Sequence, residues 1–275
     1  MVSNKNPSFV KWAGGKRQLL EQFKPLLPEK ITTYIEPFVG GGAVAFYVIK
    51  KYKPKKVILS DINEELVNAY NVIKDNVDEL IELLGKFKKK HSSEFYKKIR
   101  AQNPELSSRV TRATRFIYLN KTCFNGIYRV NSSGKFNVPM GSYKNPGICQ
   151  EKDLREVSEL LQNTTILSLP FEKISEFAKK GNFIYFDPPY YPLKGKPSFT
   201  TYTKDKFLEE EQENLAELFH KLDKRGCKVM LSNSDTDFIK GLYSHHNINS
   251  VEATRMINCN GSKRGKIKEV VVTNY

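Results

Sequence analysis

Short apolar runs alternate with longer amphipathic segments along most of the chain, and this order predicts an α/β fold. Five runs are short and largely apolar, as strands inside a parallel sheet are: residues 34–36, 57–61, 165–169, 183–186 and 228–231. Apolar residues recur at helical spacing in segments 16–27, 43–51, 64–87 with a break near Asn76, and 209–224. Two more strands are expected at 248–253 and 268–273, joined by a Gly- and Lys-rich loop. This pattern predicts a doubly wound sheet covered by helices.

Residues 86–162 interrupt the alternation and are expected to form an insertion. Lysine-rich helices come first, and the turn-forming stretch 131–134 between alternating segments predicts a β-hairpin. The formal charge of the chain is +15, and residues 86–135 carry thirteen Lys or Arg against two Glu, a net of +11. Such concentration favours a polyanionic partner, nucleic acid before an anionic membrane. The predicted organisation is an α/β domain from residues 1–85 and 163–275, with residues 86–162 inserted.

Composition argues against several other classes of protein. No stretch reaches the roughly 18 apolar residues of a membrane-spanning helix, and residues 1–11 lack the apolar segment of a signal peptide. The four cysteines are scattered without a C-x-x-C pair, which favours reduced thiols in a cytoplasmic protein. The four histidines show no metal-ligand spacing, so no metal is expected. The basic segment shows no clear amphipathic anchor, so no membrane partner is expected.

The run 183–186 ends abruptly in a carboxylate, two prolines and a tyrosine, from Asp187 to Tyr190. The prolines end the strand, and the carboxyl ends of strands are where open α/β sheets place their ligands. Asp187 and the carbonyl of Pro188 can both accept hydrogen bonds from an exocyclic amine, and Tyr190 offers a face for a planar base. The alternative is a plain Pro-Pro turn in which Asp187 is only a turn residue.

The first two predicted strands carry a second pattern, three glycines at 40–42 and an acid at the end of the next strand. Asp61 lies 21 residues after Gly40, the spacing at which an acid binds the ribose of an adenosine above a glycine-rich turn. The glycines do not follow G-x-G-x-x-G, which argues against a dinucleotide and makes a nicotinamide oxidoreductase the weakest candidate. For Asp61 alone, capping the next helix is an equal alternative.

Seven motifs together resemble one family. They are KWAGGK at 11–16, EPFVGGGA at 36–43, SDIN at 60–63, FNGIYRVNSSGKFNVPMGSYKNP at 124–146, YFDPPY at 185–190, LSNS at 231–234 and RGK at 264–266. In order and spacing, the chain resembles the Dam-type (D12 class) DNA adenine methyltransferases, especially GATC-specific members of restriction-modification systems. The resemblance implies a class I methyltransferase fold, a Rossmann-like mixed sheet, with S-adenosyl-L-methionine as cofactor and double-stranded DNA as partner. It is compatible with a cognate restriction endonuclease in the same system, without a stable complex, and the sequence leaves open whether such a partner exists.

The resemblance also implies a role for each matching residue. The catalytic residues would be Asp187, Pro188, Pro189 and Tyr190, with Tyr190 stacking on a flipped adenine. The cofactor would lie against Trp12, Lys16, Phe38, Gly40, Gly41, Gly42, Asp61, Ile62, Phe171 and Asp187. The DNA-binding residues would be Lys11, Phe124, Asn125, Ile127, Arg129, Lys135, Asn137, Pro139 and Lys144. Arg129 and Lys11 suit guanine or phosphate equally well, and Asn125 before Gly126 is also a turn former.

Two positions depart from the family pattern. Ser142 stands where relatives often carry arginine, and Leu169-Pro170-Phe171 replaces a Gly-Asp-Phe turn. The first departure removes one expected DNA contact, and the second removes a polar contact to the cofactor adenine.

Two alternatives stay open beside DNA adenine methylation. One is an amino-methyltransferase acting on RNA or cytosine with the same motif. The other is a non-catalytic DNA-binding regulator, against which the intact Asp61, Asp187 and Tyr190 argue.

Overall fold

The computed structural model describes residues 6–193, 207–254 and 266–275. Most of the basic loop at 191–206 therefore lies outside the described residues. The same holds for the loop between the last two strands, which contains Cys259 and the Arg264-Gly265 part of the RGK motif.

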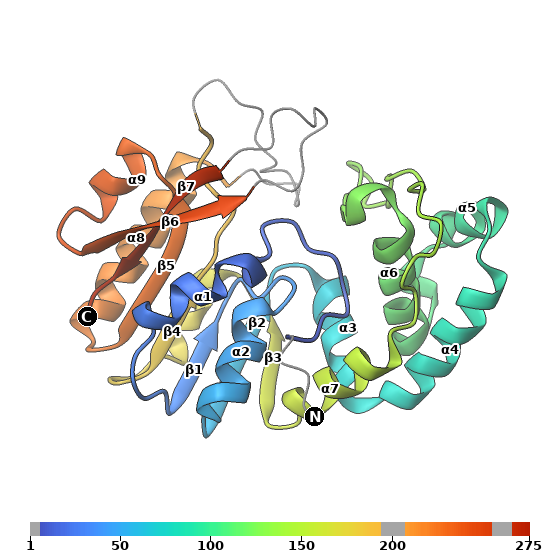
Figure 1. Cartoon of the computed structure of the whole chain (residues 1–275), viewed down its shortest axis with the longest axis horizontal. Coiled ribbons are helices and arrows are strands. Elements are labelled where there is room, and N and C mark those ends of the chain that lie inside the picture. The colour runs from blue at the N-terminus through green and yellow to red at the C-terminus, as the bar shows by residue number, and fades with distance from the viewer. Residues whose placement is uncertain (1–5, 194–206, 255–265) are drawn as a thin grey trace.

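The described residues form a seven-stranded mixed sheet in the order β3-β2-β1-β4-β5-β7-β6 (Figure 1). Strands β1 to β5 pair in parallel, and β7 runs antiparallel to both β5 and β6. The strands are β1 Thr33–Glu36, β2 Lys56–Asp61, β3 Thr164–Ser168, β4 Phe183–Phe186, β5 Lys228–Ser234, β6 Asn247–Thr254 and β7 Lys266–Thr273. This is the Rossmann-like mixed sheet that the resemblance implied, so the predicted fold class is confirmed.

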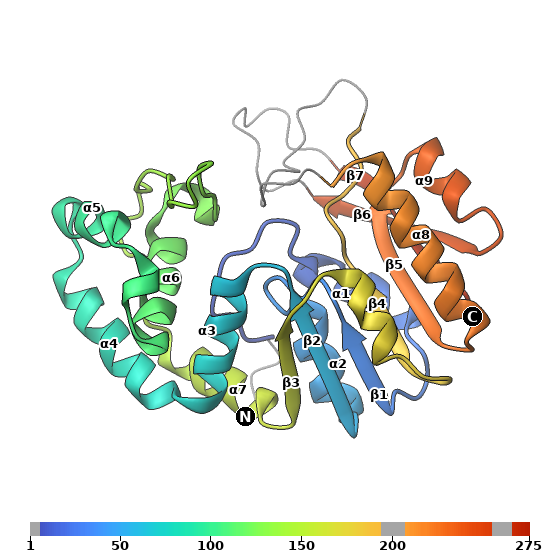
Figure 2. The same cartoon turned by 180° about the vertical axis from the view of Figure 1, so that it is seen from behind.

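Each face of the sheet is covered because successive side chains of a strand point to opposite sides. On one face Tyr34, Phe183 and Tyr185 pack against helices α2 Ala43–Tyr52 and α3 Glu64–Asp75. On the other face Ile184 and Phe186 join a separate buried cluster beneath the helices α8 Glu209–Lys224, α9 Asp237–Leu242 and the 3-10 segment η5 Phe171–Glu176. Figures 1 and 2 show α2 and α8 on opposite sides of the sheet.

Most predicted elements appear within a few residues of their expected bounds, with three differences. The helix expected at 16–27 is broken into η1 Lys16–Leu19, α1 Leu20–Phe23 and η2 Lys24–Leu26, because Pro25 cannot continue an α-helix. The expected hairpin is reduced to one bridge between Val130 and Phe136 around a turn at 131–134. The short elements α9 and η5 and the helix at residues 151–161 were not predicted.

The segment expected as an insertion is mainly helical and lies beside the β3 edge of the sheet (Figures 1 and 2). Its elements are α4 Val77–Lys90, α5 Ser93–Ala101, η3 Pro104–Leu106, α6 Arg109–Thr122, η4 Phe124–Gly126 and α7 Glu151–Leu161. Helix α4 continues through residue 86, and one buried cluster extends from the sheet into these helices. The division at residues 86 and 162 therefore stays a prediction. No described helix is long and apolar enough to cross a membrane.

Candidate active site

The carboxyl ends of the parallel strands lie on the same side of the sheet, and polar residues stand at four of these ends. Glu36 ends β1, Asp61 ends β2, Asp187 follows β4, and Ser234 ends β5. Their proximity follows from the register, because Ile35 pairs with Ile184 and Phe186 pairs with Leu231. The sheet therefore unites residues that are far apart in the sequence.

Asp187 is held in a fixed orientation by its neighbours. Because Phe186 pairs with Leu231, the next residue of β5, Ser232, lies beside Asp187, and its hydroxyl donates to Asp187 Oδ1 at 2.9 Å. A second contact to the same oxygen is an ion pair with Lys16 Nζ at 2.7 Å. Burial raises the pKa of Asp187, while Lys16 and the Ser232 hydroxyl lower it. Asp187 is thus a partly buried hydrogen-bond acceptor with two fixed partners, not a solvated turn residue.

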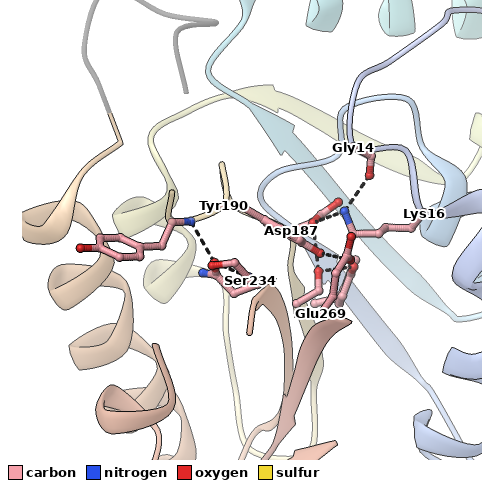
Figure 3. A network of polar contacts seen from close by, with 10 residues as sticks. Gly14, Lys16, Asp187, Tyr190, Ser234 and Glu269 are labelled. Carbon is pink, nitrogen blue, oxygen red and sulfur yellow. Dashed lines mark hydrogen bonds and ion pairs between the residues drawn. The ribbon is translucent and has the colours of Figure 1, made fainter. Parts of the chain in front are cut away.

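Lys16 reaches this site from a segment near the N-terminus. Its ammonium group also donates to the carbonyl of Gly14 at 2.6 Å and lies 4.6 Å from the centre of the Tyr190 ring. Figure 3 shows Gly14, Lys16, Asp187 and Tyr190 together around the end of the sheet. The loop at 11–16 is therefore bound to the segment 187–190 by charge and by aromatic contact.

Tyr190 is anchored at its far end. Its hydroxyl donates to Glu269 Oε2 on β7 at 2.8 Å, and burial raises the pKa of Tyr190 well above its ordinary value (Figure 3). The phenol is therefore neutral at ordinary pH. Its proposed stacking on a base stays a prediction.

The loop after β4 is supported by residues that sequence reasoning did not assign. Asn233 Oδ1 accepts from the backbone N–H of Tyr191 at 3.0 Å, and Gln212 Nε2 donates to the carbonyl of Pro189 at 2.9 Å. The amide of Asn233 in turn donates to Gln212 Oε1 at 2.9 Å. Both side chains are fully buried, as is Ser232. The sequence signal that could have identified Ser232 and Asn233 is the run of polar residues at 232–234, at the end of a buried strand.

Asp61 and the glycine turn form one structure. Asp61 accepts from the backbone N–H of Gly40 at 3.0 Å and from that of Asn63 at 3.0 Å. A Cβ on Gly40, whose φ is +47°, would lie 2.7 Å from the Trp12 ring, so Trp12 packs directly on this turn. The residue that caps helix α3 is Asn63, whose side chain accepts from Leu66 N at 3.1 Å. The helix-cap reading of Asp61 is therefore wrong.

Apolar groups flank the same turn, where the cofactor adenine was expected. Ile62 is 59% exposed, which is unusual for a large apolar side chain beside a buried strand. The rings of Phe38 and Phe171 stack with centroids 5.5 Å apart, and Phe207 packs against both. Phe207 is a further member of this group that the sequence did not indicate.

The carboxylates at the carboxyl ends of these strands suit a nucleoside that carries a positive charge. Burial raises the pKa values of Glu36, Asp61 and Asp187, that of Asp61 to about 6. Glu36 is bound by the Tyr34 hydroxyl at 2.7 Å, and Lys16 is the cation that pairs with Asp187. A bound cation would stabilise these carboxylates, while the glycine turn leaves room for close approach. The residues present therefore fit S-adenosylmethionine. No three His, Cys, Asp or Glu side chains in the described ranges lie close enough together to hold a metal ion.

The predicted DNA-binding residues lie on a surface formed by the 124–144 segment and by Lys11. Phe124 is 46% exposed, and Ile127 is half-buried. The other seven are exposed: Lys11, Asn125, Arg129, Lys135, Asn137, Pro139 and Lys144. Ser142, where relatives often carry arginine, is exposed on the same segment.

Local contacts fix the shape of this surface. Phe124 N–H donates to the carbonyl of Pro139 at 2.9 Å, and Arg129 Nε donates to Asn137 Oδ1 at 2.8 Å. Lys11 Nζ lies 3.5 Å from the centre of the Tyr143 ring. Asn125 has a φ of +54°, so its turn-forming role is real. An exposed Asn in a tight turn is also well placed to contact a ligand.

Several residues of the basic excess serve the fold of the protein. Arg115 donates to the carbonyl of Ile99 at 3.1 Å, and Lys121 donates to Gln150 Oε1 at 2.7 Å; both side chains are buried. Arg112 pairs with Glu65. The lysine-rich helices α4 and α5 lie on the side of the helical part remote from the sheet (Figures 1 and 2). The net charge of this segment therefore overstates the number of basic side chains that are available to contact DNA.

Comparisons with known proteins agree over nearly the whole chain. The D12 class N6 adenine-specific DNA methyltransferase family model matches residues 12–257. Type II methyltransferase M.MjaIII of Methanocaldococcus jannaschii is 50% identical over 97% of this chain and 98% of its own length. Type II methyltransferase M1.LlaDCHI of Lactococcus lactis subsp. cremoris is 45% identical over 97% and 95%. The DNA adenine methylase of Escherichia coli K12 is 35% identical over 97% and 95%.

Proposed function

Because the chain belongs to the D12 class N6 adenine-specific DNA methyltransferase family, we propose that it methylates the exocyclic amine of adenine within GATC in duplex DNA. The methyl donor is S-adenosylmethionine, and the target base is flipped out of the duplex into the site. The 124–146 motif, which resembles GATC-specific members of the family, supports the site assignment.

The observation that carries this proposal is the fixed orientation of Asp187. Its Oδ1 is bound by Ser232 and Lys16, which orients the carboxylate at the end of β4. Lys16 also favours the ionised form against the effect of burial, so the group can act as an acceptor. This arrangement suits an amine, which needs an acceptor for each of its two hydrogens and attacks the methyl group before it loses a proton.

The catalytic step follows from these positions. Asp187 and the carbonyl of Pro188 accept the two amine hydrogens, which draws the nitrogen toward tetrahedral geometry and directs its lone pair outward. When bound, S-adenosylmethionine would supply an electrophilic methyl group on a sulfonium, and its sulfur would leave as a neutral thioether. The methylated nitrogen then releases one of its protons to the Asp187 carboxylate or to solvent. Trp12, the glycine turn and Asp61 hold this cofactor, with Ile62 and Phe171 beside its adenine. Catalysis is mostly positioning, which contributes several kcal/mol in well-oriented reactions, on the order of 7–11 at most.

Base flipping is compensated by contacts on both sides of the extruded adenine. Unstacking costs a few kcal/mol, and stacking on an aromatic ring contributes roughly 1–3 kcal/mol per base. Tyr190 supplies that ring, and its hydroxyl bond to Glu269 fixes the far end of the side chain. Exposed Phe124 and Asn125 contact the duplex from which the base has left, while Arg129 and Lys11 read guanine or phosphate.

The first experiment measures transfer of tritiated methyl from the cofactor to two duplexes that differ only in whether GATC is present. Label in the GATC duplex alone supports the proposal. Equal label in both would remove the GATC assignment and leave adenine methylation intact. Structured RNA as a third substrate tests the RNA alternative directly, and base analysis of the labelled DNA separates adenine from cytosine.

The second experiment replaces Asp187 by alanine. We expect loss of transfer by at least about a hundredfold, because an oriented polar contact to the reacting group is removed. Cofactor affinity, measured by calorimetry, should change much less. Asp237→Ala is the matched control, because Asp237 is a fully exposed carboxylate on α9. Wild-type turnover in Asp187→Ala would refute the proposed role of Asp187.

A restriction endonuclease of the same specificity is the further partner we propose, acting on the same DNA without a stable complex. Plasmid from cells that express this chain should resist endonucleases that adenine methylation blocks at GATC. Unchanged sensitivity to every GATC-cutting enzyme would contradict methylation at GATC, and with it the specificity that the two enzymes would share.

A further inference from the structure

Asn120 joins two segments of the site, the loop that begins at Lys11, 109 residues before it in the sequence, and the turn at 124–126. It lies on helix α6, and its side chain is fully buried. Its Oδ1 accepts from the backbone N–H of Lys11 at 2.7 Å, and its Nδ2 donates to the carbonyl of Lys11 at 2.8 Å. The second hydrogen of Nδ2 reaches the carbonyl of Gly126 at 2.9 Å. One amide thus binds both polar groups of Lys11 and the turn at 124–126.

A direct contact brings the same two segments together. Gly126 has a φ of +66°, and a Cβ at this position would lie 2.5 Å from the Cβ of Lys11. The stem of Lys11 therefore packs on the bare backbone of Gly126. Hydrogen bonds and packing together leave little freedom for one segment to move without the other.

Each segment carries a different part of the proposed reaction. The turn bears exposed Phe124 and Asn125, on the surface proposed to meet DNA. The loop from Lys11 continues to Trp12, which packs on Gly40 and Gly41, and to Lys16, which pairs with Asp187. Asn120 therefore lies between DNA recognition and methyl transfer.

We propose that Asn120 is a positioning residue that couples the 124–126 turn to the 11–16 loop. A duplex that fits the turn thereby fixes Trp12 and Lys16 for reaction, and a duplex that does not fit leaves them misplaced. Asn120 contacts neither DNA nor cofactor. This inference rests on the proposed function, since it assigns a source of sequence discrimination to that same site.

The chemistry of the amide explains why the position needs asparagine. The site offers one donor, Lys11 N–H, and two acceptors, the carbonyls of Lys11 and Gly126. An asparagine amide supplies one acceptor and two donors at the same spacing. Aspartate keeps the size and the acceptor but loses both donors, and alanine loses all three bonds.

The test compares Asn120→Ala with Asn68→Ala. Asn68 is the matched control because its Nδ2 also donates to a backbone carbonyl, that of Arg109 at 2.9 Å, and joins α3 to α6 away from the turn. Transfer rates are measured on a GATC duplex and on duplexes with one base pair changed. For Asn120→Ala we expect the ratio of the rate on GATC to the rate on a changed duplex to fall by on the order of tenfold to a hundredfold. For Asn68→Ala the ratio should stay at the wild-type value.

A second readout does not depend on turnover. Trp12 is the single tryptophan of the chain and lies in the coupled loop, so its emission reports on that loop. We expect duplex DNA to shift this emission in wild type and Asn68→Ala, and not in Asn120→Ala that has bound the same duplex. If Asn120→Ala does not fold, Asn120→Asp takes its place and is judged by the same two readouts.

The outcomes separate this inference from the proposed function. The coupling is refuted if a folded Asn120 variant discriminates between GATC and changed duplexes as well as the wild type does. It is also refuted if DNA binding leaves the Trp12 emission of the wild type unchanged. Absence of transfer in the wild type would refute the proposed function, while the Trp12 emission would still decide the coupling.

Discussion

Replacing Gly42 by alanine should lower the free energy of unfolding by more than the sequence around Gly42 would indicate. Gly42 precedes helix α2 and has a φ of +72°, a conformation that L-residues rarely adopt. A Cβ here would lie 2.6 Å from the hydroxyl of Tyr70 and 2.8 Å from the ring of Phe46. Both neighbours are fully buried, and the Tyr70 hydroxyl donates to the carbonyl of Gly40 at 2.9 Å. The methyl group therefore has no space unless Tyr70 gives up this bond.

The expected loss combines backbone strain with overpacking. The left-handed conformation costs an alanine about 1–2 kcal/mol, and forcing a methyl group into a packed core costs about 1–3 kcal/mol. The free energy of unfolding should therefore fall by about 2–5 kcal/mol. Because domains are stable by only about 5–15 kcal/mol, this is a large fraction of the total.

Urea unfolding of both the variant and the wild type measures the difference. Gly85→Ala is the matched control, because Gly85 lies inside helix α4 and a Cβ there would meet nothing within 4 Å. The same substitution should there stabilise the protein by roughly 0.5–1 kcal/mol, since alanine suits a helix better than glycine. A Gly42→Ala protein within about 0.5 kcal/mol of the wild type would refute the reasoning.

Two further predictions concern pH. Burial raises the pKa of Asp61 to about 6. If its carboxylate binds the ribose, cofactor affinity should be full above that pH and about tenfold weaker at pH 5, where most of the carboxyl is protonated. In calorimetric titrations, Asp61→Asn should flatten this dependence of affinity on pH. Burial lowers the pKa of Lys121 to about 8, so the folded protein binds fewer protons than the unfolded chain above that pH and its stability rises with pH. Between pH 7 and 9 this lysine should add on the order of 1 kcal/mol, and Lys121→Met should lose that rise relative to wild type in urea unfolding.

Much of the fold could be predicted because its signals are local. The apolar run at 183–186 and the amphipathic segment at 209–224 became β4 and α8 with the expected bounds. Periodicity failed where proline divided the segment after Lys16 and where a six-residue helix such as α9 was too short to show a period. The strand-end carboxylates Asp61 and Asp187 were found because strand ends are marked by an abrupt change in polarity.

Sequence by itself determined which residue types stand at each strand end, and hence the class of chemistry. Tertiary structure alone decided their partners: Lys16 and Ser232 on Asp187, and Asn120 between Lys11 and Gly126. It also decided that Arg115 and Lys121 are buried within the protein, although charge counting had placed them in a DNA-facing excess. The physical reason is that periodicity reports which face of an element is buried, whereas a hydrogen-bond partner is set by strand register and by the path of distant segments.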